Sequence, residues 1–182
     1  TANGYTREYT VTYNYNGSGA ENTQDKATYT FKNWNTNADG TGDTYTDKQE
    51  VKNLANTAGA TVKLFAQWNS DSVTLPTPTR SGYGFAGWYD AATGGNKVAD
   101  GGAVYTPTAN KTLYAHWTTN SYTVTYNYAE NGGTEASKTS ASVSYGEAID
   151  LTPTATKAGY EFVGWNTNKD ATEGLSSLTM GT

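Results

Sequence analysis

The strongest constraint on the fold of this chain is a segment of seven residues that occurs twice. Residues 9–15 read Tyr-Thr-Val-Thr-Tyr-Asn-Tyr, and residues 122–128 repeat all seven in the same order. An identity of this length predicts tandem copies of one small structural unit. Within this opening segment the Tyr and Val residues alternate with Thr and Asn, which is the two-residue period of a half-buried β-strand.

Two further motifs recur in a fixed order. The middle motif, Gly-Tyr-x-Phe-x-Gly-Trp, occupies residues 82–88 and 159–165, with a weaker copy, Thr-Tyr-Thr-Phe-Lys-Asn-Trp, at 28–34. The closing motif is Leu-Phe-Ala-Gln-Trp at 64–68 and Leu-Tyr-Ala-His-Trp at 113–117. Each of the 5 tryptophans ends one of these motifs, which favours a place in the core over a ligand platform. We therefore expect the following side chains to be largely buried: Trp34, Trp68, Trp88, Trp117 and Trp165, with Phe85 and Phe162 beside them.

The spacing of the motifs divides the chain into three unequal copies. The first copy, 1–69, is shortened; the second, 70–119, lacks an opening segment; the third, 120–182, is truncated at its closing strand. Residues 47–55 are the one candidate for a short helix. A module of about 60 residues buries only about 60% of its unfolded surface, so neighbouring copies are expected to stabilise one another. The expected fold class is mainly β, α+β at most, with tandem small modules of short strands and little helix.

The unclosed third copy has a structural consequence. Without a closing strand, its sheet keeps an unpaired edge, and an edge of that kind recruits a substitute strand. Residues 175–180 could fold back onto the edge, or a neighbouring chain could add a strand to it. We expect residues 122–182 to be the least stable part of the chain.

Composition limits the functions open to this chain. With 12 basic and 17 acidic residues the net charge is -5, and no Lys/Arg cluster exists, which argues against nucleic acid as a partner. The absence of cysteine excludes disulfides, thiolate metal sites and a cysteine nucleophile. No apolar run approaches the roughly 18 to 20 residues of a membrane helix, so no membrane insertion is expected. The sequence reads as a fragment without its own signal or anchor.

The three motifs together resemble a known repeat. The order Tyr-Thr-Val-Thr-Tyr, then Leu-Pro-x-Pro-Thr-Arg-x-Gly-Tyr-x-Phe-x-Gly-Trp, then Thr-Leu-Tyr-Ala-x-Trp is similar to the internalin-type B-repeat, also called the Listeria–Bacteroides repeat. The resemblance covers nearly the whole chain. It implies small β-grasp-like modules that occur in tandem in secreted, wall-attached or surface-displayed bacterial proteins. It brings no catalytic residues with it.

No residue pattern predicts a catalytic, cofactor or metal site. The 1 histidine, His116, has Gln67 as its counterpart in the first copy, so we interpret it as a solvent-side strand residue. Residues 35–43 place oxygens at alternating positions as a calcium loop does, but the twelfth position is Thr46 where a bidentate Glu is needed. A polar turn is favoured there. Acidic residues are scattered singly and no pair recurs between copies, so we expect no enzyme and no cofactor.

Two functional hypotheses follow for an extracellular chain on the bacterial cell surface. In the first, the chain is a non-enzymatic spacer or structural region whose partners are the neighbouring repeat modules. In the second, it is an adhesin-like binding module that recognises a host or cell-wall protein or glycan through a sheet edge or a Tyr-rich face. The candidate ligand-facing aromatics are Tyr13, Tyr15, Tyr126 and Tyr128. Buried aromatic side chains would favour the spacer, and a row of exposed ones would favour binding.

Overall fold

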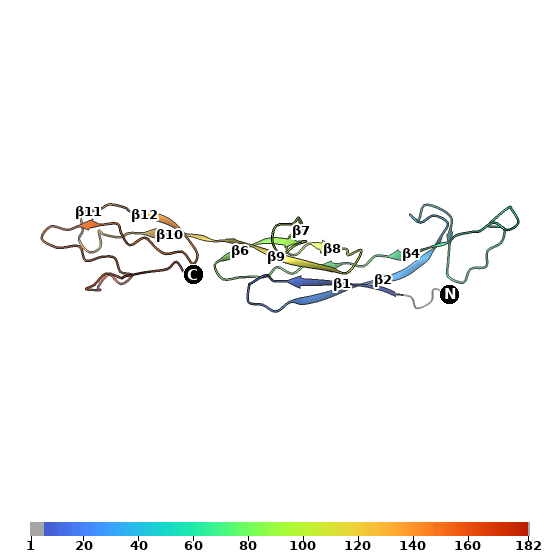
Figure 1. The fold of residues 1–182 in the computed structure, drawn as a ribbon, viewed down its shortest axis with the longest axis horizontal. Coiled ribbons are helices and arrows are strands. Elements are labelled where there is room, and N and C mark those ends of the chain that lie inside the picture. Colours follow the sequence, from blue (N-terminus) through green and yellow to red (C-terminus); the bar gives the residue numbers. More distant parts are fainter. Residues whose placement is uncertain (1–5, 182) are drawn as a thin grey trace. The chain divides into compact units, whose positions relative to one another are not determined.

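The computed structural model describes residues 6–181 and contains thirteen β-strands, with no helix in that range (Figure 1). The mainly-β prediction is therefore confirmed, while the β-grasp detail stays a prediction. The one candidate segment for a short helix, 47–55, contains no helix. Lys48 and Asn53 have φ angles of 61° and 60° in this segment, and a left-handed residue breaks a right-handed helix.

The chain forms two compact units. Unit 1 combines Thr1–Pro78 with Gly87–His116, and unit 2 combines Thr79–Ala86 with Trp117–Thr182. Both units therefore contain residues from two of the sequence copies.

A hairpin begins unit 1. Strands β1 (Thr6–Asn14) and β2 (Thr23–Asn35) pair antiparallel, with Tyr13 opposite Thr23 and Tyr9 opposite Ala27. Asn16 and Gly17 take positive φ angles of 48° and 81° in the turn, a conformation that Asn and Gly adopt at low cost. The opening segment of the first copy is thus a strand, as its alternation predicts.

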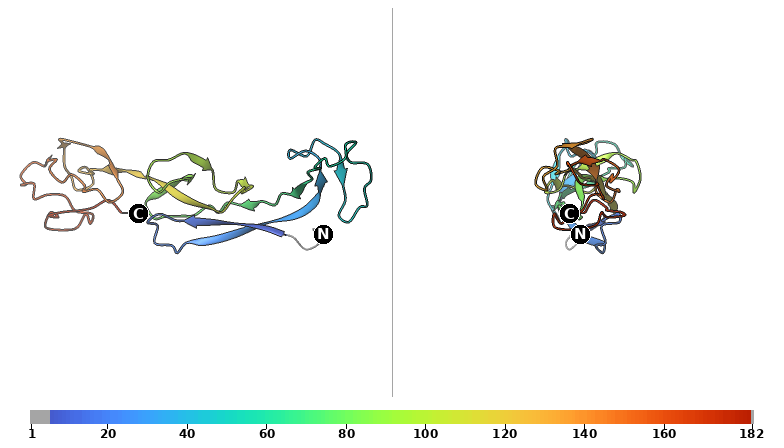
Figure 2. Two further views of the ribbon diagram at one scale, coloured as in Figure 1. Left: turned by 45° about the vertical axis from the view of Figure 1, so that its right-hand side comes forward. Right: turned by 90° about the vertical axis from the view of Figure 1, so that its left-hand side faces the viewer.

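The other edge of β1 pairs with a distant strand. Strand β9 (Lys111–Thr119) runs parallel to β1, with Val11 opposite Lys111 and Tyr13 opposite Leu113 (Figure 1, and from a second side in Figure 2). The opening segment of the first copy therefore pairs with the closing motif of the second.

The sheet that contains β1 has seven strands, in the order β3-β2-β1-β9-β6-β7, with β4 also paired to β2. The strands not yet given are β3 (Thr44–Tyr45), β4 (Phe65–Asn69), β6 (Tyr83–Tyr89) and β7 (Lys97–Ala99). A separate two-stranded pair joins β5 (Val73–Thr74) to β8 (Val104–Tyr105).

The core of unit 1 centres on Trp88, which is 0% exposed. The other fully buried residues of this unit include Val11, Tyr13, Leu75 and Leu113. These residues come from both ends of the unit's sequence, so the core itself holds the hairpin and β9 together.

The aromatic core prediction is confirmed for Trp88, and the other four tryptophans are less completely buried. Those four are half-buried: Trp34, Trp68, Trp117 and Trp165. Phe85 is also half-buried, and Phe162 is 37% exposed. The side chains around each Trp differ: two tyrosines of the first opening segment, Tyr13 and Tyr15, contact Trp88, whereas Trp165 has Tyr126 and the partly exposed Phe162 against it.

Unit 2 contains two small antiparallel pairs. Strand β10 (Ser121–Thr125) pairs with β12 (Ser140–Ser144), and β11 (Glu135–Ala136) pairs with β13 (Ala155–Thr156). The register of the first pair sets Tyr122 opposite Val143. The opening segment of the third copy therefore forms a hairpin like that of β1 and β2.

Residues 79–86 pack within unit 2 against the third copy. The Asn120 amide donates to the Gly82 carbonyl, and the Tyr83 and Tyr145 rings lie 5.7 Å apart, edge to face. Gly82 has a φ of 77°, and a Cβ on it would lie 2.2 Å from the Tyr145 ring. Only glycine fits there, because both the backbone angle and the neighbouring ring exclude a side chain.

Candidate functional site

A Tyr–Trp–Pro contact forms the centre of unit 1. The indole Nε1 of Trp88 donates to the Pro76 carbonyl at 2.8 Å, and the Tyr13 ring centroid lies 5.2 Å from the Trp88 ring. The Tyr13 hydroxyl donates to Asp25 at 3.0 Å. The pKa of the Tyr13 hydroxyl is raised, mainly because the group is buried and also because it donates to the Asp25 carboxylate. The Trp therefore has its one polar atom satisfied while its ring fills the core.

The same contact occurs in the third copy. The Trp165 Nε1 donates to the Pro153 carbonyl at 2.7 Å, and the Tyr126 ring lies 5.1 Å from the Trp165 ring. Tyr126 is 4% exposed, and its hydroxyl donates to the backbone carbonyl of Asp150 at 2.6 Å. The proline-containing segment before the middle motif, here called the leader, spans residues 75–82 in the second copy and 151–159 in the third. The opening segment, this leader and the middle motif thus meet in the same way in both units.

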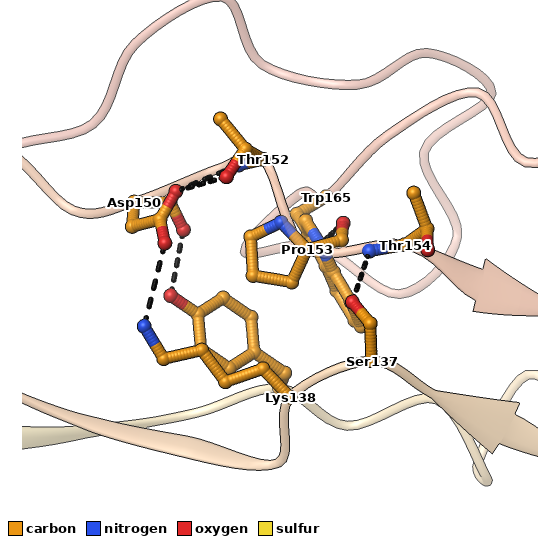
Figure 3. A network of polar contacts seen from close by, with 8 residues as sticks. Ser137, Lys138, Asp150, Thr152, Pro153, Thr154 and Trp165 are labelled. Carbon is orange, nitrogen blue, oxygen red and sulfur yellow. Dashed lines mark hydrogen bonds and ion pairs between the residues drawn. The ribbon is translucent and has the colours of Figure 1, made fainter.

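A polar network holds the leader of the third copy in place (Figure 3). Asp150 accepts hydrogen bonds from the backbone and the hydroxyl of Thr152, and an ion pair of 3.3 Å joins it to Lys138. The bonds from Thr152, followed by the charge of Lys138, hold the pKa of Asp150 below its ordinary value. The Thr154 amide donates to the Ser137 hydroxyl on the other side of Pro153. These bonds fix the carbonyl that Trp165 uses.

One strand distinguishes the two units. In unit 1, β9 follows β1 in the sheet order, and its inward residues Leu113 and Ala115 are both 0% exposed. In the described part of unit 2, β10 pairs only with β12, and the middle motif at 159–165 forms no strand. The third copy therefore has the same Tyr–Trp–Pro contact as unit 1, but no closing strand among its described residues.

A groove of about 540 Å³ occupies that place. It lies entirely within the third copy, and its lining includes Val124, Tyr126, Tyr128, Tyr160, Phe162 and Trp165. Tyr160 and Val163 are 70% and 67% exposed, so the wall made by the middle motif is apolar and open to solvent. A volume of this size is typical of sites that hold a ligand or a peptide.

The tail folds back and contributes Leu175 and Leu178 to the lining of this groove. The Ile149 amide donates to the Leu178 carbonyl, and the Met180 amide donates to the Glu147 carbonyl. Ala148 and Thr179 form an isolated β-bridge between the two segments. The tail therefore pairs with the segment after β12 and leaves the other edge of β10 without a strand in the described structure.

The four tyrosines predicted to face a ligand fall into two pairs. Tyr13 is 1% exposed and Tyr126 is 4% exposed, and each contacts the core Trp of its unit. Tyr15 and Tyr128 are half-buried. Tyr15 also packs on Trp88, at 5.7 Å between ring centroids, while Tyr128 lines the groove. A ligand-facing role stays a prediction, and the exposure now favours Tyr15 and Tyr128 for it.

The loop at 35–43 is organised by a residue that the sequence did not single out. The Asn35 side chain is 1% exposed; its oxygen accepts from the amides of Asn37 and Gly42, and its nitrogen donates to the carbonyls of Gly40 and Gly42. In the third copy, the oxygen of Asn166 likewise accepts from the Asn168 amide. The shared Trp-Asn-Thr-Asn sequence at 34–37 and 165–168 was the available signal for this turn.

His116 is bound on two sides. Its Nε2 lies 2.9 Å from the Ala91 carbonyl, and its ring stacks on Tyr89 with centroids 3.9 Å apart and planes 6° apart. It is half-buried, so the expectation of a solvent-side strand residue missed these partners. The sequence carries no signal for these partners, because the Ala91 carbonyl lies 25 residues earlier in the chain and no local pattern predicts a contact at that distance.

Across residues 6–181, the structure contains no group of three or more His, Cys, Asp or Glu side chains placed to hold a metal ion. Over the same range, no helix has the length and apolar character needed to cross a membrane.

The sequence matches a family model three times. The model is that of the Listeria-Bacteroides repeat domain, and the matches cover residues 2–58, 55–116 and 122–180. The chain belongs to the Listeria-Bacteroides repeat family. The resemblance inferred from the three motifs is thereby confirmed.

Members of this family occur in long bacterial proteins. Internalin H of Listeria monocytogenes serovar 1/2a is 39% identical over 97 residues, which are 53% of this chain and 16% of that protein. A second relative, from Evansella cellulosilytica, is named as a Gly-rich membrane protein. It is 29% identical over 175 residues, which are 80% of this chain and 20% of that protein. The chain therefore spans about a fifth or less of these curated relatives. No solved structure matches this chain.

The coarse functional assignment follows from these similarities. The chain is a repeat region of the type found in internalin-like and membrane-associated bacterial proteins.

Proposed function

We propose that this chain is a non-enzymatic spacer in a bacterial cell-surface or secreted protein, with neighbouring repeats as its partners. The observation that carries the proposal is that aromatic side chains of the motifs pack against one another inside each unit. Trp88 and Tyr13 are buried, and Tyr126 is buried against Trp165 with the same proline carbonyl contact. Aromatic side chains used in this way stabilise each module and leave fewer of them to face a ligand.

Contacts between sequence copies support neighbouring repeats as partners. Within unit 1, β1 of the first copy pairs with β9 of the second. Within unit 2, Tyr83 of the second copy packs against Tyr145 of the third. A chain whose copies share strands and cores in this way is suited to extend a surface protein, because each copy is stabilised by the next.

The names of the relatives support a surface location. One relative is an internalin and another is named as a membrane protein, and both are far longer than this chain. A spacer in such a protein would separate a functional domain from the cell envelope.

A display experiment tests the spacer. One, two or three tandem copies of the whole chain would be inserted between a reporter domain and a wall anchor on a surrogate Gram-positive cell. We expect the binding of a bulky antibody to the reporter to rise with copy number, with the total reporter measured after cell lysis as the control. Equal antibody binding at every copy number would contradict a spacer.

The alternative is an adhesin-like module, and the partial exposure of Tyr15 and Tyr128 is the observation in its favour. It predicts saturable binding of the purified chain to a glycan array or to host matrix proteins, weakened in Tyr15→Ala or Tyr128→Ala. A variant at an exposed threonine away from both, Thr61→Ala, is the matched control.

A further inference from the structure

The connection between β3 and β4, residues 46–64, is a long loop of unit 1 that contains no strand (Figure 2). Every residue from 52 to 63 is exposed. The loop has two internal backbone hydrogen bonds, of 3.3 and 3.2 Å, from the amides of Gln49 and Ala60 to the carbonyls of Thr46 and Thr57. Within the described range 6–181, no backbone–backbone hydrogen bond involves residues 50–56. An exposed loop whose backbone is held by so few bonds is a preferred place for a protease to cut a folded protein.

Lys52 lies inside the stretch without backbone bonds. A protease binds the residues on both sides of the bond that it cuts in an extended conformation, through their backbone groups. Around Lys52, the chain can take that conformation without breaking a backbone hydrogen bond of the described structure. The other two lysines of the loop are placed differently, because the amide that follows Lys48 is bonded to Thr46 and β4 begins two residues after Lys63.

Exposure of a lysine side chain is not enough for cleavage, as Lys32 illustrates. Its side chain is exposed, but the residue lies in β2, where its neighbours Phe31 and Asn33 pair with β4. A protease can bind that part of the backbone only after the sheet opens locally. The freedom of the backbone therefore distinguishes Lys52 from Lys32.

Contacts across the sheet join the chain before this loop to the chain after it. Strand β2 pairs with β4, with Thr30 opposite Asn69, and β1 pairs with β9, with Tyr13 opposite Leu113. The Tyr13 ring also packs on the fully buried Trp88. These contacts lie outside the loop, so they do not require the loop to be continuous.

We propose that residues 46–64 are a site of limited proteolysis for a trypsin-like serine protease, which cuts after Lys52, and that the two pieces remain one folded unit. The acidic specificity pocket of such a protease binds the basic side chain of Lys52. Over the whole reaction, water adds to the Lys52 carbonyl carbon and the bond to the Asn53 nitrogen breaks, which leaves a carboxylate and an amine as new chain ends. The proposal goes beyond the spacer function and does not depend on it, because its tests measure only cleavage and assembly.

Limited digestion of the whole chain with trypsin is the direct test. Samples taken over time would be analysed by intact mass under denaturing conditions. We expect the first two products to be residues 1–52 and 53–182, because local opening must precede cleavage at a residue that the sheet holds. A first cut after any other lysine or arginine overturns the proposal.

Two lysine variants locate the cut. Lys52→Gln should slow the first cleavage of the chain at least about tenfold, because the remaining lysines are cut only after local opening. Lys32→Gln is the matched control, since it removes another exposed lysine but one that lies in β2, and it should leave the rate unchanged. Thermal unfolding of both variants confirms that they are folded. Equal rates for the wild type and the Lys52 variant overturn the proposal, as does slowing in the Lys32 variant alone.

Size-exclusion chromatography of the cut chain tests whether the pieces remain assembled. Both pieces should elute together at the volume of the intact chain and should separate only in urea. Hydrogen exchange along β1 should be as slow in the cut chain as in the intact one, because β1 keeps its pairing with β9. Separation of the pieces without urea, or faster exchange along β1, overturns the proposal.

Discussion

Units 1 and 2 contain the same Tyr–Trp–Pro contact, but among residues 6–181 only the contact in unit 1 has a closing strand beside it. Trp88 in unit 1 is fully buried, whereas Trp165 in unit 2 is half-buried although its hydrogen bond and its tyrosine partner are equivalent. Two features differ: Tyr15 also packs on Trp88, and β9 adds the fully buried Leu113 and Ala115 to the core of unit 1. The local contact therefore positions the Trp, and these additional side chains remove it from water.

The largest contrast between the units is expected in amide exchange. Thr12 and Thr125 hold the same position in the two opening segments, and the Thr12 residue lies opposite Thr112 of β9. Exchange at Thr12 should be slower by about a hundredfold or more, because it requires the sheet to open. Residue-resolved exchange by NMR measures both amides in one sample. Similar rates would mean that the third copy closes without a further strand.

Truncation of the two tryptophans should give unequal losses. Trp88→Ala removes a fully buried ring and should lower the free energy of unfolding by about 3–5 kcal/mol. Trp165→Ala removes a half-buried ring and should cost clearly less, by about half. Urea unfolding followed by tyrosine fluorescence and far-UV circular dichroism measures both variants. An unchanged transition in Trp88→Ala would show that the core is misassigned.

Two glycines at the start of the middle motif provide a smaller contrast. Gly82 and Gly159 have φ angles of 77° and 80°, but only Gly82 has a neighbour, the Tyr145 ring, where a Cβ would stand. Gly159→Ala should cost about 1 kcal/mol from the backbone angle, and Gly82→Ala should cost about 2–3 kcal/mol. The melting temperatures of the two variants test this order. Equal destabilisation would mean that Tyr145 moves aside freely.

The acid limb of the stability curve should depend on Asp150 in unit 2 and Asp90 in unit 1. Bonds from Thr152 lower the pKa of Asp150, and the bond from the Asn96 amide lowers that of Asp90, each from 3.8. A carboxyl with a lowered folded pKa stabilises the protein above its unfolded pKa, and this contribution is lost as the pH falls through the folded pKa. Asp150→Asn and Asp90→Asn should therefore each lower the melting temperature slightly at pH 6. Below pH 3.8 the difference in melting temperature between each variant and the wild type should become smaller. A constant gap from pH 6 to pH 2 would contradict the linkage.

Calcium should have the smallest effect of all. In the loop at 35–43, the Asn35 side-chain nitrogen already donates hydrogen bonds to the carbonyls of Gly40 and Gly42. The Asp39 carboxylate accepts two hydrogen bonds from Thr41. We expect no change in melting temperature on addition of calcium or of a chelator, because the loop does not present enough free oxygens to the ion. A calcium-dependent rise of several degrees would overturn this interpretation of the loop.

Local periodicity predicted much of this fold. The alternation of Tyr and Val in the opening segments predicted the hairpin strands, and the recurring motifs predicted the family. The pairing of β1 with β9 was not predictable in the same way, because the register of strands about 100 residues apart is set by the common core and not by local sequence. The hydrogen bonds from the two indoles to the Pro76 and Pro153 carbonyls were not predictable from the sequence either, because they too depend on how the segments pack in the core.

The candidate site was only partly predictable. The missing closing motif at the end of the third copy predicted an open edge, and the groove lies along that edge. The fate of the tail was not predictable, since its bonds to Glu147 and Ile149 depend on a turn whose Gly146 takes a φ of 82°. Exposure of individual tyrosines also depends on contacts across the sheet, which is why Tyr13 and Tyr15 differ although they belong to one segment.

The parallel pairing of β1 and β9 has a consequence for mechanical load. Tension applied to the N-terminal end of β1 and the C-terminal end of β9 pulls two parallel neighbours in opposite directions along their axes. Their backbone hydrogen bonds are then loaded in shear and must break together, whereas a hairpin pulled at its open end separates one bond at a time. This pair should therefore resist extension at forces that separate an antiparallel hairpin such as β10 and β12 from its open end. Under tension along the chain, the sheet that joins β1 to β9 would keep its length until these bonds fail together.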